Sequence, residues 1–170
     1  MKKLVALVMS LCFILALMTP AFAETKDSLI IGTGTEATKF FPADAKGTNT
    51  NDYVIVIANL YDSVVRMNAQ GEIVPCLATD WSVSEDGLCY TFTLREHVKF
   101  HDGSEMTADD VVFSLDMGAN LASGKALMIN YDHAEKVDEK TVNVYLTAPY
   151  AGFINSMASR VAMVFSKAHY

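Results

Sequence analysis

The stretch that most constrains the fold runs from Trp81 to Asp116, because it combines the pattern of a β-hairpin with the start of an α-helix. Apolar residues occupy every second position over Tyr90–Leu94, the period of a strand with one buried face. Asp86-Gly87 supplies a turn before this strand, since glycine adopts positive φ at little cost. Trp81 and Val83 alternate in the same way on the first arm. We therefore expect a hairpin that ends near Arg95, with its aromatic side chains in the core.

Thr107 marks the start of a helix shortly after the hairpin. Its hydroxyl can accept a hydrogen bond from the amide of Asp110, whose carboxylate can accept one in return, as in a capping box. The charges of Asp109 and Asp110 also suit the positive end of the helix dipole, so we assign both residues a structural role and not a catalytic one. Gly118 is the expected C-terminal end. The expected buried stripe consists of Ala108, Val111, Val112 and Leu115.

Between hairpin and helix stands Phe100-His101-Asp102-Gly103, which we expect to form a polar turn. The contiguous order of hairpin, turn and capped helix resembles the signature of the bacterial extracellular solute-binding proteins of family 5. These proteins are the capture subunits of dipeptide, oligopeptide and nickel ABC importers. Cys89 stands where the family usually has Ser or Thr, and His97 where it usually has Gly. The resemblance implies a transport receptor and not an enzyme.

The resemblance also implies an α/β, periplasmic binding protein-like fold of type II, in which two lobes close over a ligand at a hinge. Members of the family are considerably longer than the 170 residues of this chain. Residues 24–170 are therefore expected to form an incomplete, N-terminal part of the solute-binding domain. Alone, such a part should expose sheet edges and apolar surface and aggregate. The implied partners are a small peptide or nickel chelate and an inner-membrane permease, and the implied state is a monomer.

The N-terminus has the three parts of a secretory signal peptide. Its start is basic, residues 4–18 are mostly apolar, and Ala21-Phe22-Ala23 is a small-x-small cleavage site. The apolar run is shorter than the ~20 residues that span a bilayer. Cys12 follows a leucine, where a lipid-anchored protein would have a small residue. We therefore predict that residues 1–23 are removed on export and that the product is periplasmic, without a lipid anchor.

The charge of the chain excludes two classes of partner. The sequence has 13 Lys and Arg against 20 Asp and Glu, a formal net charge of −7, and its basic residues do not cluster. Nucleic acids and anionic membranes are bound through clustered positive charge, so we expect neither as a partner. With 51% apolar and 19% charged residues, the chain has the composition of a globular protein rather than a disordered one.

The region before the hairpin holds four candidate ligand contacts. The short apolar run with β-branched residues at positions 28–33 predicts a first strand. The resemblance places the end of this strand at the edge of the cleft between the lobes. Thr35 and Glu36 follow this strand and are candidates on that ground, with a solvated turn as the alternative. Thr50 or Asn51 can cap a helix that runs towards Met67, and we include both as candidates. The β-branched run inside that helix leaves a strand as the alternative.

After the helix that starts at Thr107, the pattern predicts a second hairpin, a short helix and a last strand. Their ranges are Ala134–Val137 with Thr141–Leu146, Tyr150–Ala158 and Ala162–Phe165. Arg160, between the last two, is the fifth candidate contact. The resemblance places it where nickel-binding relatives have a pocket arginine, and a guanidinium can bind a carboxylate through two parallel hydrogen bonds. A salt bridge at the surface or between lobes is the alternative.

The four-residue spacing of His97 and His101 is that of two metal ligands on a helix face. Their neighbours have a strand pattern, however, and the chain has no HExxH motif and no G-x-S-x-G turn for a nucleophilic serine. The adjacent carboxylates Glu85-Asp86 and Asp109-Asp110 stand in turn and cap contexts. We expect no enzyme, no metal and no cofactor. The alternative is a secreted metal-binding or hydrolytic domain that uses His97 and His101.

The sequence leaves the pairing of the cysteines and the identity of the ligand open. Cys76 and Cys89 would remain after cleavage, and an oxidising compartment allows a disulfide. The hairpin turn, however, places Cys89 near Ser84, while Cys76 lies well before the strand. The family's ligands include peptides, nickel chelates, sugars and opines, and the residues that choose among them would lie mostly beyond Tyr170 in a longer receptor.

Overall fold

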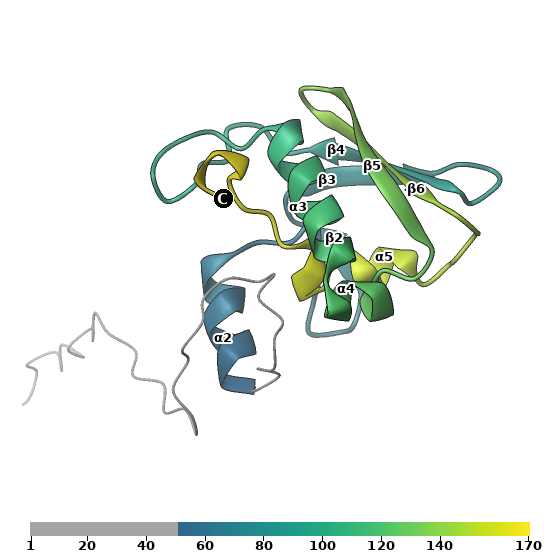
Figure 1. The fold of residues 1–170 in the computed structure, drawn as a ribbon, viewed down its shortest axis with the longest axis horizontal. Helices are drawn as coiled ribbons and strands as arrows, with labels where there is room; N and C mark the ends of the chain where they lie inside the picture. The colour runs from purple at the N-terminus through teal and green to yellow at the C-terminus, as the bar shows by residue number, and fades with distance from the viewer. Residues whose placement is uncertain (1–50) are drawn as a thin grey trace, which may run out of the picture. The chain divides into compact units, whose positions relative to one another are not determined.

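The computed structural model describes residues 51–170, apart from the side chains of residues 51–55, 122 and 123. Its centre is an antiparallel sheet with the strand order β3-β4-β6-β5. These strands are β3 (Ala78–Val83), β4 (Cys89–Leu94), β5 (Tyr131–Asp138) and β6 (Thr141–Leu146). Figure 1 shows helix α3 (Ala108–Asn120) lying across one face of this sheet. The predicted signal peptide, the predicted strand 28–33 and residues 35, 36 and 50 lie outside the described residues.

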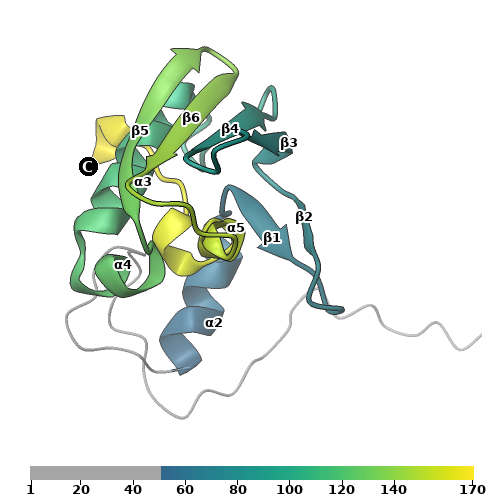
Figure 2. The same cartoon turned by 90° about the vertical axis from the view of Figure 1, so that its right-hand side faces the viewer.

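The remaining elements surround the sheet. A two-stranded ribbon pairs β1 (Val65–Met67) with β2 (Ile73–Pro75), and Figure 2 shows it at the side of α5. The other helices are α2 (Asn51–Leu60), α4 (Ala122–Leu127) and α5 (Phe153–Ser156), with the 3-10 helices η1 (Arg160–Ala162) and η2 (Lys167–His169). None of the described helices has the length and apolar character needed to cross a membrane.

Both predicted hairpins are confirmed. In the first, Trp81 pairs with Phe92 and Val83 with Tyr90, and the turn places Gly87 at a φ of +69°. The second joins β5 to β6. A long-range pairing of β4 with β6 then merges the two hairpins into one sheet, with Phe92 opposite Val142.

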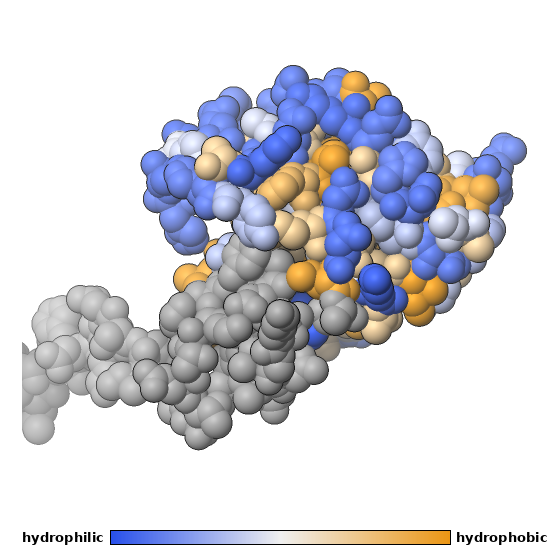
Figure 3. Space-filling model, viewed as in Figure 1, coloured by the Kyte–Doolittle hydropathy of each residue, from blue (hydrophilic) through white to orange (hydrophobic). Residues whose placement is uncertain are grey.

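One face of the sheet forms the core. Tyr90, Phe92 and Leu94 of β4 are buried, whereas Thr93 between them is exposed. Against them pack the buried side chains Val142, Val144, Leu146, Val111, Leu115, Phe153 and Met157. The alternation expected on the first arm is only partly present, because β3 is an edge strand: Trp81 is half-buried, but Val83 is 47% exposed. On the side drawn in Figure 3, hydrophilic residues surround a smaller area of apolar surface near α3.

Helix α3 starts as predicted but ends differently. The Thr107 hydroxyl accepts from the Asp110 amide, and Asp110 Oδ2 accepts from the Thr107 amide at 2.8 Å, so the capping box is confirmed. Gly118, the predicted terminator, lies inside the helix instead. A Cβ atom there would stand 2.0 Å from the carbonyl oxygen of Val161. Glycine is therefore required for the close approach of η1 to α3, and its prediction as a helix end is wrong.

The helix predicted from Asn51 towards Met67 ends at Leu60, so its last part is wrong. Val64 and Val65 are buried as expected, but Val64 lies in a bend and Val65 begins β1. Their amides donate to the carbonyls of Ala162 and Met157, partners almost a hundred positions away. Burial of these two valines therefore came from tertiary pairing and not from a helical face.

The last predicted strand, Ala162–Phe165, is also wrong. Ala162 is the last residue of the 3-10 helix η1. Of the other three residues, only Met163 forms a bridge, an isolated one with Ser63. Hydrogen bonds from Val64 to Ala162 and from Val164 to Asp62 flank this bridge. The pairing stops after Val164, because the amide and the carbonyl of Phe165 bond to the hydroxyl of Ser114 instead. The predicted short helix is present but reduced to α5.

The two described cysteines are free thiols. Cys76 precedes β3, whose first residue Ala78 pairs with Leu94 at the far end of β4. Cys89 begins β4 beside the turn, where its amide donates to the Ser84 hydroxyl at 2.9 Å. The hairpin thus holds the two cysteines at opposite ends, which explains why they do not pair. Burial raises the pKa of the Cys76 thiol.

Candidate functional site

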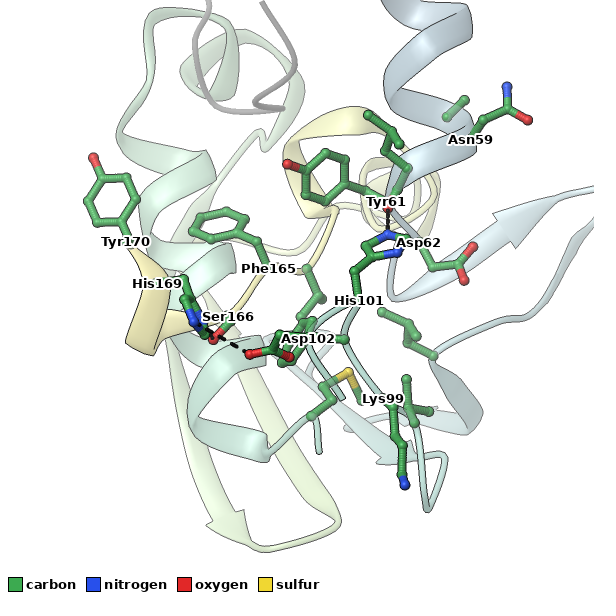
Figure 4. Close-up of a pocket in the computed structure, with 17 residues that line it drawn as sticks. Asn59, Tyr61, Asp62, Lys99, His101, Asp102, Phe165, Ser166, His169 and Tyr170 are labelled. Carbon is green, nitrogen blue, oxygen red and sulfur yellow. Dashed lines mark hydrogen bonds and ion pairs between the residues drawn. The ribbon is translucent and has the colours of Figure 1, made fainter. Parts of the chain in front are cut away.

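A cavity of about 610 Å³ opens beside the C-terminal end of α2. Three segments that are far apart in the sequence form its walls: residues 58–62, residues 98–106 and residues 164–170. Leu77 also contributes to the lining. The volume lies within the range of small-molecule sites. Figure 4 shows the side chains that line it.

The lining is mainly apolar, with polar groups from each wall. The apolar and aromatic side chains are Leu60, Tyr61, Leu77, Val98, Phe100, Met106, Val164, Phe165 and Tyr170. The polar side chains are Asn59, Asp62, Lys99, His101, Asp102, Ser166 and His169. Burial raises the pKa of the Tyr61 phenol, so this side chain stays neutral over the physiological range. A cavity of this composition suits a small organic solute with few charged groups.

The loop between β4 and α3 forms one wall, and its centre is the predicted polar turn. Phe100 accepts from the amide of Gly103, which has a φ of +90°, and the Phe100 amide donates to Ser104. Asp102 Oδ1 accepts from the hydroxyl of Ser104 at 2.7 Å and from its amide at 2.9 Å. These two bonds, with a smaller effect of His169, hold the pKa of Asp102 below its usual value. The turn is thus confirmed and is internally braced.

Two neighbouring residues of this turn contact the other two walls. His101 Nε2 lies 3.2 Å from the carbonyl oxygen of Leu60 at the end of α2. Because that oxygen can only accept, the imidazole donates through Nε2. Asp102 Oδ2 lies 3.5 Å from His169 Nε2 in η2. Figure 4 shows both contacts at the same turn, which therefore connects all three walls.

The wall of residues 164–170 is attached to α3. The amide of Lys167 donates to Asp110 Oδ1 at 2.8 Å, while the other oxygen of Asp110 serves the capping box. Ser114, one turn further along α3, donates to the carbonyl of Phe165 at 3.2 Å and accepts from its amide at 3.1 Å. Asp110 is only 7% exposed and Ser114 is fully buried. The two side chains therefore connect the helix to the cavity wall.

Sequence reasoning found the cap but missed this second role of Asp110. The partners of Asp110 and Ser114 on the wall lie more than fifty positions away, and no local pattern reveals them. The one available signal was a pair of polar residues four positions apart on the buried side of the helix. Buried polar groups need hydrogen-bond partners, so such a pair indicates a tertiary contact without identifying it.

Ser166, His169 and Asp102 follow one another in the order of a hydrolase triad. Ser166 Oγ lies 3.2 Å from His169 Nδ1, and His169 Nε2 lies 3.5 Å from Asp102 Oδ2. The side chains of His169 and Asp102 are 65% and 39% exposed, however. A triad requires a shielded acid and an oxyanion hole. Asp102 is instead solvated and engaged by Ser104, which favours a structural connection between two walls.

The predicted ligand contacts do not gather at this cavity. Thr35, Glu36 and Thr50 lie outside the described residues. Asn51 is the first residue of α2, whereas only the last residues of that helix line the cavity. Arg160 lies in a separate, shallow depression with Ser114, Gly118, Leu121, Val161, Met163 and Phe165. Its guanidinium makes no ion pair with another described residue.

The rings of His97 and His101 lie against different neighbours. His97 has a φ of +57°, and its ring lies 3.8 Å from Glu105 and 3.9 Å from Glu96. His101 points instead to the Leu60 carbonyl. Residues 51–170 contain no group of three or more His, Cys, Asp and Glu that could hold a metal ion.

Comparison with known proteins gives a consistent result. Residues 72–170 match the bacterial extracellular solute-binding proteins, family 5 middle. The dipeptide-binding protein of Escherichia coli K12 is 37% identical over 129 residues, which cover 64% of this chain and 24% of the relative. The glutathione-binding protein GsiB of Shigella dysenteriae is 30% identical over 162 residues, 94% of this chain and 31% of the relative.

Solved structures extend the comparison to the fold. NikZ from Campylobacter jejuni, in complex with Ni(L-His), has a TM-score of 0.68 and 29% identity over 81% of this chain and 27% of its own. DppA from Helicobacter pylori, in complex with the peptide STSA, has a TM-score of 0.68 and 25% identity over 80% of this chain and 30% of its own. The predicted fold class, part of a type II periplasmic binding protein, is thus confirmed. The chain spans between about a quarter and a third of the length of these relatives.

Proposed function

The chain belongs to the bacterial extracellular solute-binding proteins of family 5, and from this premise we propose that it acts in the substrate-binding component of an ABC importer. In this role it captures a small solute outside the inner membrane and presents it to a permease. The mechanism is population shift: the solute contacts the closed form better than the open form, and the closed form docks on the permease. No chemical step is part of this function.

The solute is proposed to be built from amino-acid units. The named relatives and neighbours bind a dipeptide, glutathione, a tetrapeptide and a nickel–histidine complex. All of these ligands carry amine, amide or carboxylate groups together with a variable side chain. A peptide is therefore the first candidate and a metal chelate of an amino acid the second.

The observation that carries the proposal is the extent of the family match. It includes the hairpin, the polar turn and the capped helix, and with them two of the three walls of the cavity, residues 98–106 and 164–170. The cavity volume of about 610 Å³ is large enough for part of such a solute. Neither the exposed histidines nor the acidic pairs supply a comparable argument for catalysis.

We retain Thr35, Glu36, Thr50, Asn51 and Arg160 as proposed solute contacts. Arg160 has the clearest physical argument of the five, because its guanidinium has no partner among residues 51–170 and a solute carboxylate could supply one. We also propose that residues 1–23 are cleaved on export and that the protein acts as a periplasmic monomer. Mass spectrometry of the secreted product, which would begin at Glu24, tests the cleavage.

Isothermal titration calorimetry on the full-length protein tests the function. Dipeptides, tripeptides, glutathione and Ni(L-His)₂ are titrated in turn, with free Zn²⁺ as the probe of the alternative metal-binding role. We expect saturable binding of at least one amino-acid-derived solute. Binding of zinc alone, lost when His97 and His101 are both changed to alanine, would overturn the proposal in favour of a metal-binding domain.

A further inference from the structure

The floor of the cavity beside α2 is part of the apolar core. Leu77, Val164 and Phe165 are at most 7% exposed, and they belong to segments whose backbone is paired with other elements. Met106 and Phe100 are half-buried at its side. Such a floor does not need to rearrange to receive an apolar group, because its side chains are already packed from behind.

Both carboxylates of the lining already have partners. Asp62 forms an ion pair with Arg66. Asp102 accepts from Ser104 and lies beside His169. Lys99 has no ion pair among the described residues, but Figure 4 shows its ammonium directed away from the other labelled side chains. A cationic ligand group would therefore compete with the partners of Asp62 and Asp102, and an anionic group would find only the Lys99 ammonium, which is directed away from the other labelled side chains.

The rim of the cavity, in contrast, exposes apolar surface. Leu60 is 39% exposed, and Tyr170, whose ring packs against Phe113 at 5.5 Å, is 68% exposed. Burying a charged group without a partner is costly, whereas an uncharged group that covers such rings and aliphatic side chains is favoured. The floor and the rim of the cavity therefore both favour an uncharged group.

We propose that this cavity is a subsite for an uncharged aromatic or branched aliphatic group, and that it discriminates against ionised groups. The solute that carries this group is taken from the proposed function, on which this part of the inference rests. For a peptide solute, the subsite selects a neutral apolar side chain over acidic and basic ones. The contacts of His101 with Leu60 and of His169 with Asp102 set its width.

Two fluorescent probes with the same aromatic skeleton test the subsite on the full-length protein. N-phenyl-1-naphthylamine is uncharged, and 1-anilinonaphthalene-8-sulfonate adds one sulfonate. We expect the neutral probe to bind in a saturable way and about tenfold or more tightly than the anionic one, because the sulfonate gains no partner in the cavity. Equal or tighter binding of the anionic probe would refute the proposed selectivity.

A pair of methionine variants locates the probe. Met106→Trp fills the cavity from its side, whereas Met67→Trp adds the same bulk on exposed strand β1, outside the lining. The first is expected to weaken binding of the neutral probe about tenfold or more and the second less than about twofold. Circular dichroism confirms that both are folded. If both variants bind the probe like the wild type, the cavity is not its site and the proposal fails.

The outcome also separates the subsite from the proposed function. A solute identified by calorimetry that carries an aromatic side chain should displace the neutral probe. If such a solute binds but leaves the probe in place, the subsite assignment is wrong and the receptor function stands. If the probe binds with the expected dependence on Met106 but no amino-acid-derived solute binds, the cavity chemistry stands and the proposed function fails.

Discussion

Replacement of Gly118 by alanine is expected to destabilise the protein, although the same change stabilises most helices. In a helix interior alanine is favoured over glycine by about 1 kcal/mol. At Gly118 the new Cβ would stand 2.0 Å from the carbonyl oxygen of Val161 and 3.0 Å from its carbonyl carbon. Both atoms belong to the backbone, so no rotation of a side chain relieves the clash.

The size of the effect follows from what must move. To restore a normal contact, α3 and η1 must separate by roughly 1 Å, and η1 carries the buried side chains of Val161 and Ala162. Overpacking of this kind costs typically about 1–3 kcal/mol. Because the backbone itself is displaced, we take the upper end of that range. After the gain in helix propensity is subtracted, a net loss of about 2 kcal/mol remains.

Urea denaturation of the full-length protein measures this loss. The sole tryptophan, Trp81, packs against the core and reports unfolding by fluorescence. The matched control is Asn120→Ala, an exposed position in the same helix, which is expected to change stability by less than about 0.5 kcal/mol. Since η1 leads into the wall of residues 164–170, Gly118→Ala should also weaken binding of the neutral probe. A Gly118→Ala protein as stable as the wild type would refute the close approach of α3 and η1.

Three further predictions concern polar side chains. Asp110→Ala removes the carboxylate that accepts from the Thr107 amide in the capping box and from the Lys167 amide, so thermal unfolding should show a loss of about 2–3 kcal/mol. The exposed Asp109→Ala, as control, should shift Tm far less. The hydrogen bonds from Ser104 hold the pKa of Asp102 below its unfolded value of about 3.9. The ionised carboxylate of Asp102 therefore stabilises the fold above that pH. The difference in Tm between the wild type and Asp102→Asn should then stay constant above about pH 5 and shrink as the pH falls through the lowered pKa; a constant difference at low pH would contradict this. Arg160→Ala should weaken calorimetric binding of a carboxylate-bearing solute by about tenfold or more, and Arg160→Lys should restore part of it; unchanged affinity would remove Arg160 from the site.

Sequence reasoning reached the family and the general fold through features that are local. The hairpin over Trp81–Arg95, the turn at Phe100–Gly103 and the capping box at Thr107 each depend on residues fewer than twenty positions apart. The types of a few neighbouring residues therefore predict their hydrogen bonds and their periodicity. The order of the three features along the chain resembled that of the family. The candidate solute contacts stay predictions: Asn51 and Arg160, the two that lie among the described residues, do not line the cavity.

The sequence by itself thus determined the local elements and the family to which they belong. Only the tertiary structure decided that β4 pairs with β6, that Val65 begins a strand rather than ending a helix, and that Gly118 allows η1 to approach α3. It also decided that Asp110 connects a helix cap to a wall of the cavity. The physical reason is the same in each case. Since the amide of Val65 also donates to Met157, each of these arrangements involves a contact between segments more than forty residues apart. The geometry of such contacts exists only after the intervening elements have packed together.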